Sequence, residues 1–147
     1  MHRELITFEV AGQLFGLDIM AIREIRAWTP VTRLPRVPHY VAGVVNLRGT
    51  VLPVVDLAAR LGWDRSEPTA RHAIIVVQLG GKAMGLIVES VSDIVPLPDG
   101  TLQPPPPSSG DALVPFLEGL AAIDERMVPV LDIQALAAED LAEAART

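Results

Sequence analysis

The chain has 147 residues, of which 50% are hydrophobic and 20% are charged, and its formal net charge is −6. This length predicts one domain, or two very small domains that share a core, and the apolar content excludes a disordered chain. The absence of cysteine excludes disulfides and thiolate zinc sites, and an acidic chain with the single lysine Lys82 is not suited to sequence-independent binding of nucleic acid.

The histidines and the apolar runs of the chain bear on metal binding and on membrane insertion. His2, His39 and His72 lack the spacing of metal ligands on one element, so no structural metal is expected. The apolar runs are far shorter than the roughly 20 residues that a bilayer span requires, so no direct membrane insertion is expected. The N-terminal stretch carries charged residues where a signal peptide would be apolar, which predicts a cytoplasmic protein.

The chain contains an internal repeat. Residues 5–25 align without gaps on residues 74–94, and residues 43–57 align on residues 119–133. In each copy, two runs of alternating apolar residues are joined by a glycine-containing turn, which is typical of a β-hairpin, and a second strand pair follows. About 60 residues form only a marginal core, so we expect the two copies to pack together as small barrels of about five strands each.

Residue chemistry predicts several local features. Asp56 and Asp132 each precede a short helical pattern and are predicted to be helix N-caps. Pro53 and Pro129 lie within apolar strands, which indicates a strand edge or a bulge. The proline-rich residues 97–115 predict a stiff surface loop, and residues 133–146 predict a C-terminal helix that docks through Leu136 and Leu141.

No catalytic constellation is evident. Asp56 and Asp132 could form a paired acid site, but helix capping explains them better. Gly12 and the pair Gly80–Gly81 lie between strands rather than before a helix, so they do not fit a phosphate-binding loop. We therefore expect neither enzymatic activity nor a cofactor.

The sharpest single motif is the turn Asn46-Leu47-Arg48-Gly49. Asn and Gly favour a turn, which predicts that Leu47 and Arg48 are held out at a hairpin tip. The equivalent turn of the second copy, residues 123–126, is acidic where this one is basic. Because the two copies share a scaffold, positions at which they differ are candidates for function, and Arg48 is therefore a candidate interface residue.

A second difference between the copies follows the first hairpin. Ile19, Ile22 and Ile25 alternate with charged residues, and their spacing is also compatible with a place in the core. The charged residues Arg23, Glu24 and Arg26 are predicted to form an exposed edge suited to orienting a partner.

These residues carry a family resemblance. Residues 43–57, GVVNLRGTVLPVVDL, together with residues 16–19, 23–26 and 31–35, resemble the CheW family of chemotaxis coupling proteins. Residues 85–88 and 91–94 are similar to the second half of that family, and the resemblance covers about residues 4–140. The chain is therefore identified as a single CheW-like domain over residues 1–147.

The resemblance implies a mainly β fold of two intertwined five-stranded SH3-like barrels, with halves at about residues 5–70 and 71–137 that exchange strands. It implies no catalysis and a bridging role between the cytoplasmic tips of methyl-accepting chemoreceptors and the regulatory domain of a CheA-like histidine kinase. Glu24 and Arg48 match charged family positions in these contacts, and Ile22, Ile25 and Gly43 match neighbouring ones. With the turn residues Asn46 and Leu47, they form the predicted protein interface.

Two alternatives stay open at this point. A CheW-like protein could serve a chemosensory pathway other than flagellar chemotaxis, such as surface motility. A small ligand-binding barrel or enzyme is the alternative of another class, and it would require a concave pocket with convergent polar groups.

Overall fold

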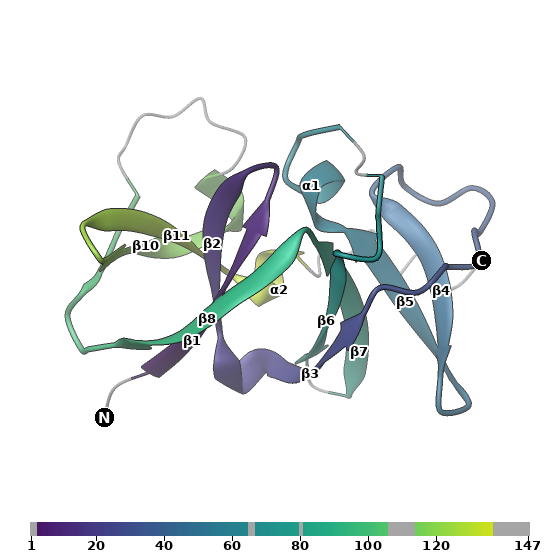
Figure 1. Ribbon diagram of the computed structural model, residues 1–147, viewed down its shortest axis with the longest axis horizontal. Coiled ribbons are helices and arrows are strands. Elements are labelled where there is room, and N and C mark those ends of the chain that lie inside the picture. The colour runs from purple at the N-terminus through teal and green to yellow at the C-terminus, as the bar shows by residue number, and fades with distance from the viewer. Residues whose placement is uncertain (1–2, 65–66, 80, 106–113, 137–147) are drawn as a thin grey trace.

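The computed structural model describes residues 3–64, 67–79, 81–105 and 114–136. The fold is mainly β, as predicted, and its two curled sheets lie side by side (Figure 1). Sheet A has the order β8 (Ser90–Leu97), β1 (Arg3–Val10), β2 (Gln13–Asp18), β11 (Arg126–Leu131), β10 (Leu117–Ile123) and β9 (Leu102–Gln103). Sheet B has the order β3 (Ile22–Ala27), β6 (Ala73–Leu79), β7 (Lys82–Val88), β5 (Thr50–Asp56) and β4 (Val41–Leu47).

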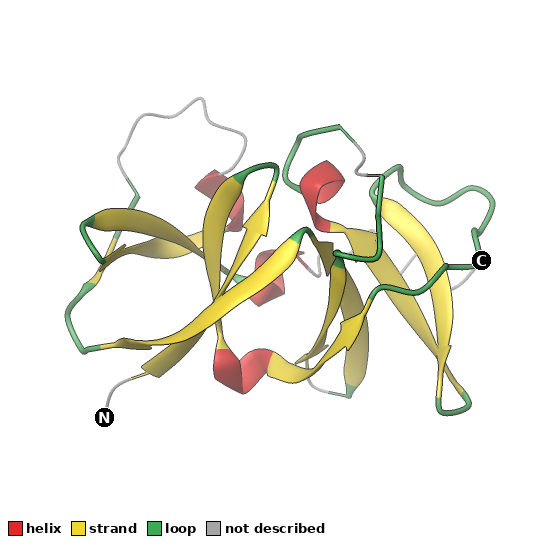
Figure 2. Cartoon of the chain, in the orientation of Figure 1, coloured by secondary structure: helices red, strands yellow, loops and turns green. Residues whose placement is uncertain are grey.

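Short helical turns connect these strands (Figure 2). They are η1 (Ile19–Ala21), α1 (Leu57–Arg60), η2 (Val114–Phe116) and α2 (Ile133–Leu136). Asp56 accepts a hydrogen bond from the backbone N–H of Ala59, and Asp132 accepts one from the N–H of Gln134. Both aspartates therefore satisfy helix N-terminal donors, as predicted.

The two halves of the chain exchange strands. Sheet A contains β1 and β2 from the first half with β8, β10 and β11 from the second, whereas sheet B contains β6 and β7 from the second half with β3, β4 and β5 from the first. The matching strands of the repeat occupy matching places, and each sheet contains one parallel pair, β2 with β11 and β7 with β5. Sheet A has six strands rather than five because the two-residue β9 pairs with β10.

The largest apolar cluster, here called the middle core, lies between the sheets. Phe8 and Phe15 of sheet A and Ile75 and Leu86 of sheet B are all fully buried in it. Burial of a side chain of this size contributes about 1.5–3 kcal/mol. β6 also sends its alternate residues, Ile74 and Val76, into a second cluster inside sheet B, which explains why its sequence is apolar on both faces.

A pair of backbone contacts closes sheet B. Thr32, in the segment that follows edge strand β3, forms an isolated bridge with Val44 of β4 at the opposite edge, with N–H···O distances of 2.9 and 2.8 Å. Gly43 permits this approach, because a Cβ at its position would lie 2.1 Å from the carbonyl oxygen of Thr32. In sheet A the equivalent glycine, Gly119, lies against Gln103 of β9 in the same way.

Other expectations need correction or lie outside the described residues. Pro53 and Pro129 are not on edge strands: β5 and β11 are interior, and each proline directly precedes the residue at which pairing with β7 or β2 begins. Within its described part, the proline-rich segment is not one surface loop, because β8 continues to Leu97 and β9 interrupts it; residues 106–113 lie outside the described part. Leu136 is buried, as predicted for the docking side of the C-terminal helix, while residues 137–146 and Leu141 lie outside the described part.

Asp56→Ala is expected to reduce the free energy of unfolding by about 0.5–2 kcal/mol, because a buried N-cap acceptor is lost. Chemical denaturation measures this change. Asp56→Asn is the matched control, since its side-chain oxygen can still accept from Ala59 and should retain most of the stability. Equal losses in the two variants would contradict the capping role.

Gly43→Ala is expected to destabilise the chain by about 1–3 kcal/mol, because φ is 151° there and the new methyl group would meet backbone atoms. Gly49→Ala is a useful comparison: its φ is 85°, but nothing lies within 4 Å of the added methyl group. Gly43→Ala should therefore have the lower denaturation midpoint. The reverse order would contradict closure of sheet B through Gly43.

Candidate protein-interaction site

The β4–β5 hairpin ends in a two-residue turn, Arg48–Gly49. Both residues have positive φ, 50° and 85°, as a type I′ hairpin turn requires. Asn46 supports the turn, because its Oδ1 accepts a hydrogen bond of 2.8 Å from the N–H of Gly49. Only Arg48 of the two predicted tip residues projects outward. Leu47 is the last residue of β4 and is 6% exposed, so the prediction that it is held out at the tip is wrong.

Arg48 forms an ion pair with Glu24 of strand β3. The distance between Arg48 Nη2 and Glu24 Oε2 is 2.7 Å, and the other carboxylate oxygen of Glu24 lies 3.1 Å from Nη1 of Arg26. β3 and β4 are the two edges of sheet B, so the pair spans the seam that Thr32 and Val44 close. The structure thus brings together two residues that the sequence assigned to separate features.

The cations around Glu24 control its protonation. The hydrogen bond from Arg48, followed by that from Arg26, lowers the pKa of Glu24 below its ordinary value, and Glu24 in turn raises the pKa of Arg48. The Glu24 side chain is 24% exposed and that of Arg48 is 61% exposed. Glu24 therefore remains ionised at neutral pH, and Arg48 keeps part of its guanidinium available to a partner.

The predicted interface residues of β3 divide between two faces of the strand. Glu24 and Arg26 pair with Val76 and Ile74 of β6, whose side chains face the inside of sheet B, so the charged residues share that side. Ile22 packs against the middle core, and Ile25 pairs with a middle-core residue of β6 but is 42% exposed. Strand β3 therefore presents charge on one side and apolar surface on the other.

Gly43 belongs to neither the charged surface nor the apolar surface of this site. It is buried, and its place against Thr32 makes it a support for the seam beside the ion pair. Leu47 likewise supports the turn from inside sheet B, packed in one cluster with Leu52 and Val54. The surface part of the predicted site therefore consists of Glu24, Arg48, Asn46 and Ile25, with Ile22 half-buried beside them.

Exposed apolar residues lie at equivalent positions of the repeat, and sequence reasoning identified only Ile25 among them as an interface residue. Ile25 of β3 is equivalent to Ile94 of β8, which is 52% exposed, and Val51 of β5 is equivalent to Met127 of β11; these two are 69% and 50% exposed. The alignment of the two copies contained this signal, because the same positions carry large apolar residues in both. The alignment does not show how exposed each of these positions is to solvent.

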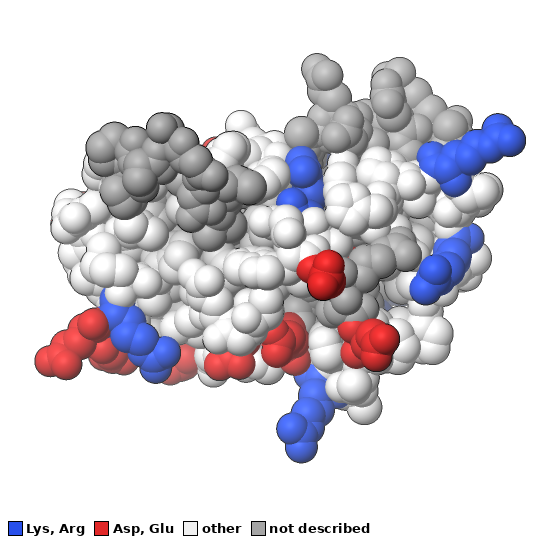
Figure 3. Space-filling model, turned by 90° about the horizontal axis from the view of Figure 1, so that it is seen from above, with Lys and Arg blue, Asp and Glu red and all other residues white. Residues whose placement is uncertain are grey.

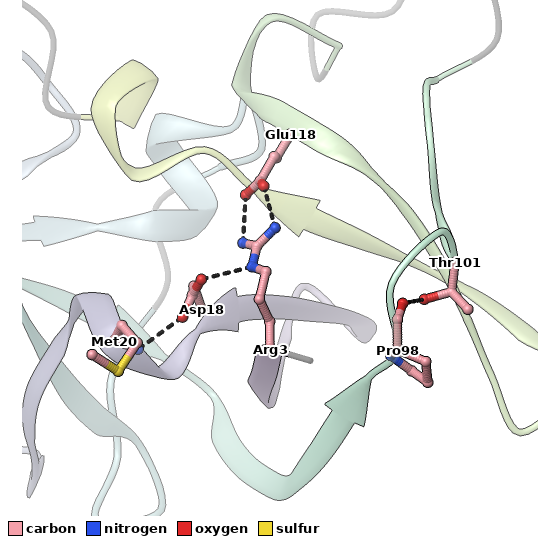
Figure 4. Close-up of polar contacts among 6 residues, drawn as sticks. All are labelled: Arg3, Asp18, Met20, Pro98, Thr101 and Glu118. Carbon is pink, nitrogen blue, oxygen red and sulfur yellow. Dashed lines mark hydrogen bonds and ion pairs between the residues drawn. The ribbon is translucent and has the colours of Figure 1, made fainter. Parts of the chain in front are cut away.

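A second charged cluster, formed by Arg3, Asp18 and Glu118, lies on sheet A (Figure 4). The guanidinium of Arg3 contacts both carboxylate oxygens of Glu118, at 2.5 and 3.0 Å, and its Nε lies 2.8 Å from Asp18. Asp18 also accepts from the N–H of Met20 at the start of η1. This cluster ties β1, β2 and β10 together at the point where the chain leaves sheet A for sheet B.

A shallow pocket bears on the alternative of a ligand-binding barrel or enzyme. It has a volume of about 240 Å³ and lies beside the β1–β2 turn, with Asp64, Glu67, His72 and Glu89 in its lining. Acidic side chains are visible on the upper face of the molecule (Figure 3). Within the described residues, no group of three or more potential ligands is placed to hold a metal ion. No helix in the described part of the chain is long and apolar enough to cross a membrane.

Comparison with known proteins agrees with the fold. Residues 4–141 match the CheW-like domain. The chain is 50% identical over 143 residues to a probable chemotaxis protein CheW of Rhizobium etli, covering 97% of this chain and 92% of the relative, and 48% identical, with the same coverage, to the chemotaxis protein CheW of Rhizobium meliloti. The crystal structure of the scaffolding protein TtCheW from Thermoanaerobacter tengcongensis superposes with a TM-score of 0.83 at 33% identity, covering 92% of this chain and 88% of that one.

The match over residues 4–141, together with the two curled sheets that exchange strands, defines a CheW-like domain. The chain belongs to the CheW family of chemotaxis scaffolding proteins.

Removal of the Arg48 cation is expected to raise the pKa of Glu24 toward its ordinary value, because its strongest hydrogen-bond donor is lost. An NMR pH titration of the carboxyl group in Arg48→Met would measure this shift, with Arg48→Lys as the variant that keeps a cation. Because the folded-state pKa is lowered, the pair stabilises the fold above the unfolded-state pKa, about 4.3, and this stabilisation is lost as pH falls through the folded-state pKa. A Glu24 pKa that is the same in Arg48→Met and wild type would contradict the assignment.

Proposed function

We propose that this chain is a non-enzymatic adaptor that acts as one CheW-like domain in the cytoplasm. It couples the cytoplasmic tips of chemoreceptors to the regulatory domain of a CheA-like histidine kinase. Its similarity to proteins named as chemotaxis and scaffolding proteins supports this role. The observation that carries the proposal is the division of β3 into a charged side and an apolar side, since a bridging protein needs two surfaces that can be occupied together.

The proposed mechanism is a difference in binding free energy. An adaptor changes kinase activity only if it binds the active and inactive assemblies with unequal affinity. The Glu24–Arg48 pair is suited to one of the two contacts, because a charged surface fixes the register of a partner and disfavours wrong ones. The apolar side chain of Ile25 is suited to the other contact, where burial of apolar surface supplies affinity.

The family also includes relatives with other names. The chain is 32% identical over 115 residues to the protein PilI of Pseudomonas aeruginosa, covering 78% of this chain and 65% of the relative. Its identity to the chemotaxis proteins of the two Rhizobium species is higher and extends over nearly the whole chain. This difference favours a chemotaxis pathway over another chemosensory pathway.

Charge reversal at either member of the pair is expected to weaken binding of one partner at least about tenfold, because a complementary charge is replaced by a like charge. Isothermal titration calorimetry of the Glu24→Arg and Arg48→Glu variants with the kinase regulatory domain and with a receptor-tip fragment measures this loss of affinity. Thermal unfolding should remain close to that of wild type, since both side chains lie at the surface. Lys82→Glu, at an exposed position on another hairpin, is the matched control and should bind both partners normally.

The double reversal Glu24→Arg/Arg48→Glu separates two roles of the pair. It can rebuild the ion pair within the chain, so wild-type binding by the double variant would mean that the pair only orders the turn. A direct contact with a partner predicts that the double variant still binds weakly. Folded single variants that bind both partners with wild-type affinity would overturn the interface assignment.

A further inference from the structure

Arg60, the last residue of α1, lies at the junction of the two sheets. Its Cζ atom is 4.5 Å from the ring centroid of Tyr40 and 4.6 Å from that of Phe116. Its guanidinium N–H groups donate to the carbonyl oxygens of Ala135 and Leu136, both at 3.4 Å. One side chain therefore contacts residues from the first half of the chain and from the second half.

The two aromatic residues are equivalents in the repeat. Tyr40 precedes β4, and its carbonyl oxygen accepts from the N–H of Asp56 at 2.7 Å; Phe116 precedes β10, and its carbonyl oxygen accepts from the N–H of Asp132 at 2.8 Å. The equivalent of Arg60 itself is Leu136, which is 1% exposed and supplies a carbonyl oxygen to it. The guanidinium thus occurs once at the pseudo-symmetric junction and is not repeated.

Each aromatic residue lies at the start of a strand that leads to a hairpin turn. β4 runs from beside Tyr40 to Arg48, and β10 runs from Phe116 to the turn Asp124–Glu125. Each strand has seven residues, which corresponds to a length of about 23 Å. A small rotation of one aromatic residue relative to the other would be magnified into a larger displacement between the two turns.

The chemistry of Arg60 suits it to fix this rotation. The middle core holds the sheets together, but apolar contact is non-directional. A guanidinium stacked on aromatic rings and donating to two carbonyl groups imposes defined directions, because its donors form a planar fork.

We propose that Arg60 is a positioning residue that sets the orientation of the Arg48 turn relative to the Asp124–Glu125 turn. It does so by joining Tyr40, Phe116 and the carbonyl groups of Ala135 and Leu136 in α2. The orientation itself is a property of the free chain. Its consequence, that binding at one sheet is communicated to the other, rests on the proposed adaptor function.

The orientation can be measured directly because the chain contains no cysteine. Val51→Cys and Met127→Cys introduce exposed, equivalent positions beside the two turns for spin labels. Double electron–electron resonance on the labelled free chain then gives the distribution of distances between the two spin labels. We expect a narrow distribution with Arg60, a broader one with Arg60→Lys, which keeps the cation but loses the fork, and the broadest with Arg60→Met.

Ile87→Val in the same labelled chain is the control for general destabilisation, because Ile87 is buried inside sheet B and is not among the contacts of Arg60. It should leave the distribution unchanged. If Arg60→Met does not fold, Arg60→Lys decides: a broadened or shifted distribution supports the proposal. A wild-type distribution in the folded Arg60 variants overturns it.

A binding experiment on unlabelled chains tests the consequence. Arg60→Lys should bind the kinase regulatory domain and the receptor-tip fragment separately within about twofold of wild type. The change in affinity for one partner when the other is present should become smaller. If the wild-type chain binds neither partner, the proposed adaptor function fails, whereas the distance result still decides the role of Arg60.

Discussion

Burial of the middle core is the constraint on which the rest of the structure depends. β1 and β2 on one side and β6 and β7 on the other each present apolar residues to it. Alternate residues of β6 and β7 fill the inside of sheet B, and Leu5 of β1 belongs to the cluster inside sheet A. Strands buried on both faces cannot lie at a free surface. Edge strand β3, by contrast, has no fully buried residue, and the candidate interaction site lies on it and on the neighbouring β4–β5 turn.

The seam of sheet B shows how a structural requirement can also produce a recognition surface. Closing the sheet brings Thr32 against Val44, and this same approach places Glu24 beside Arg48. An exposed ion pair contributes little to stability by itself. Its value lies in ordering a guanidinium that is still partly open to solvent, so that a partner meets a charge of fixed position.

Sequence reasoning was most successful where the signal is local. The repeat, the hairpins and the helix-capping role of Asp56 depend on period-two patterns, turn residues and N-cap chemistry, and all are present. The prediction that Leu47 lies at the hairpin tip was wrong because the sequence alone does not show that the turn consists of Arg48 and Gly49. The Glu24–Arg48 contact could not be predicted, since it depends on the closure of a sheet whose edge strands are distant along the chain. Burial of Gly43 was missed because a glycine in an apolar run does not reveal which atoms approach it.

Exchange of strands between the sheets has a consequence for synthesis on the ribosome. All five strands of sheet B have been synthesised once Val88 has been made, so this sheet can assemble before β10 and β11 of sheet A are available. β1 and β2 are made before these strands, yet they pair with β8 and β11, which are made after them. The edges of β1 and β2 must therefore remain available, and protected from other nascent chains, until β11 has been made. The β1–β2 hairpin is thus translated before sheet B but belongs to the sheet that is completed later.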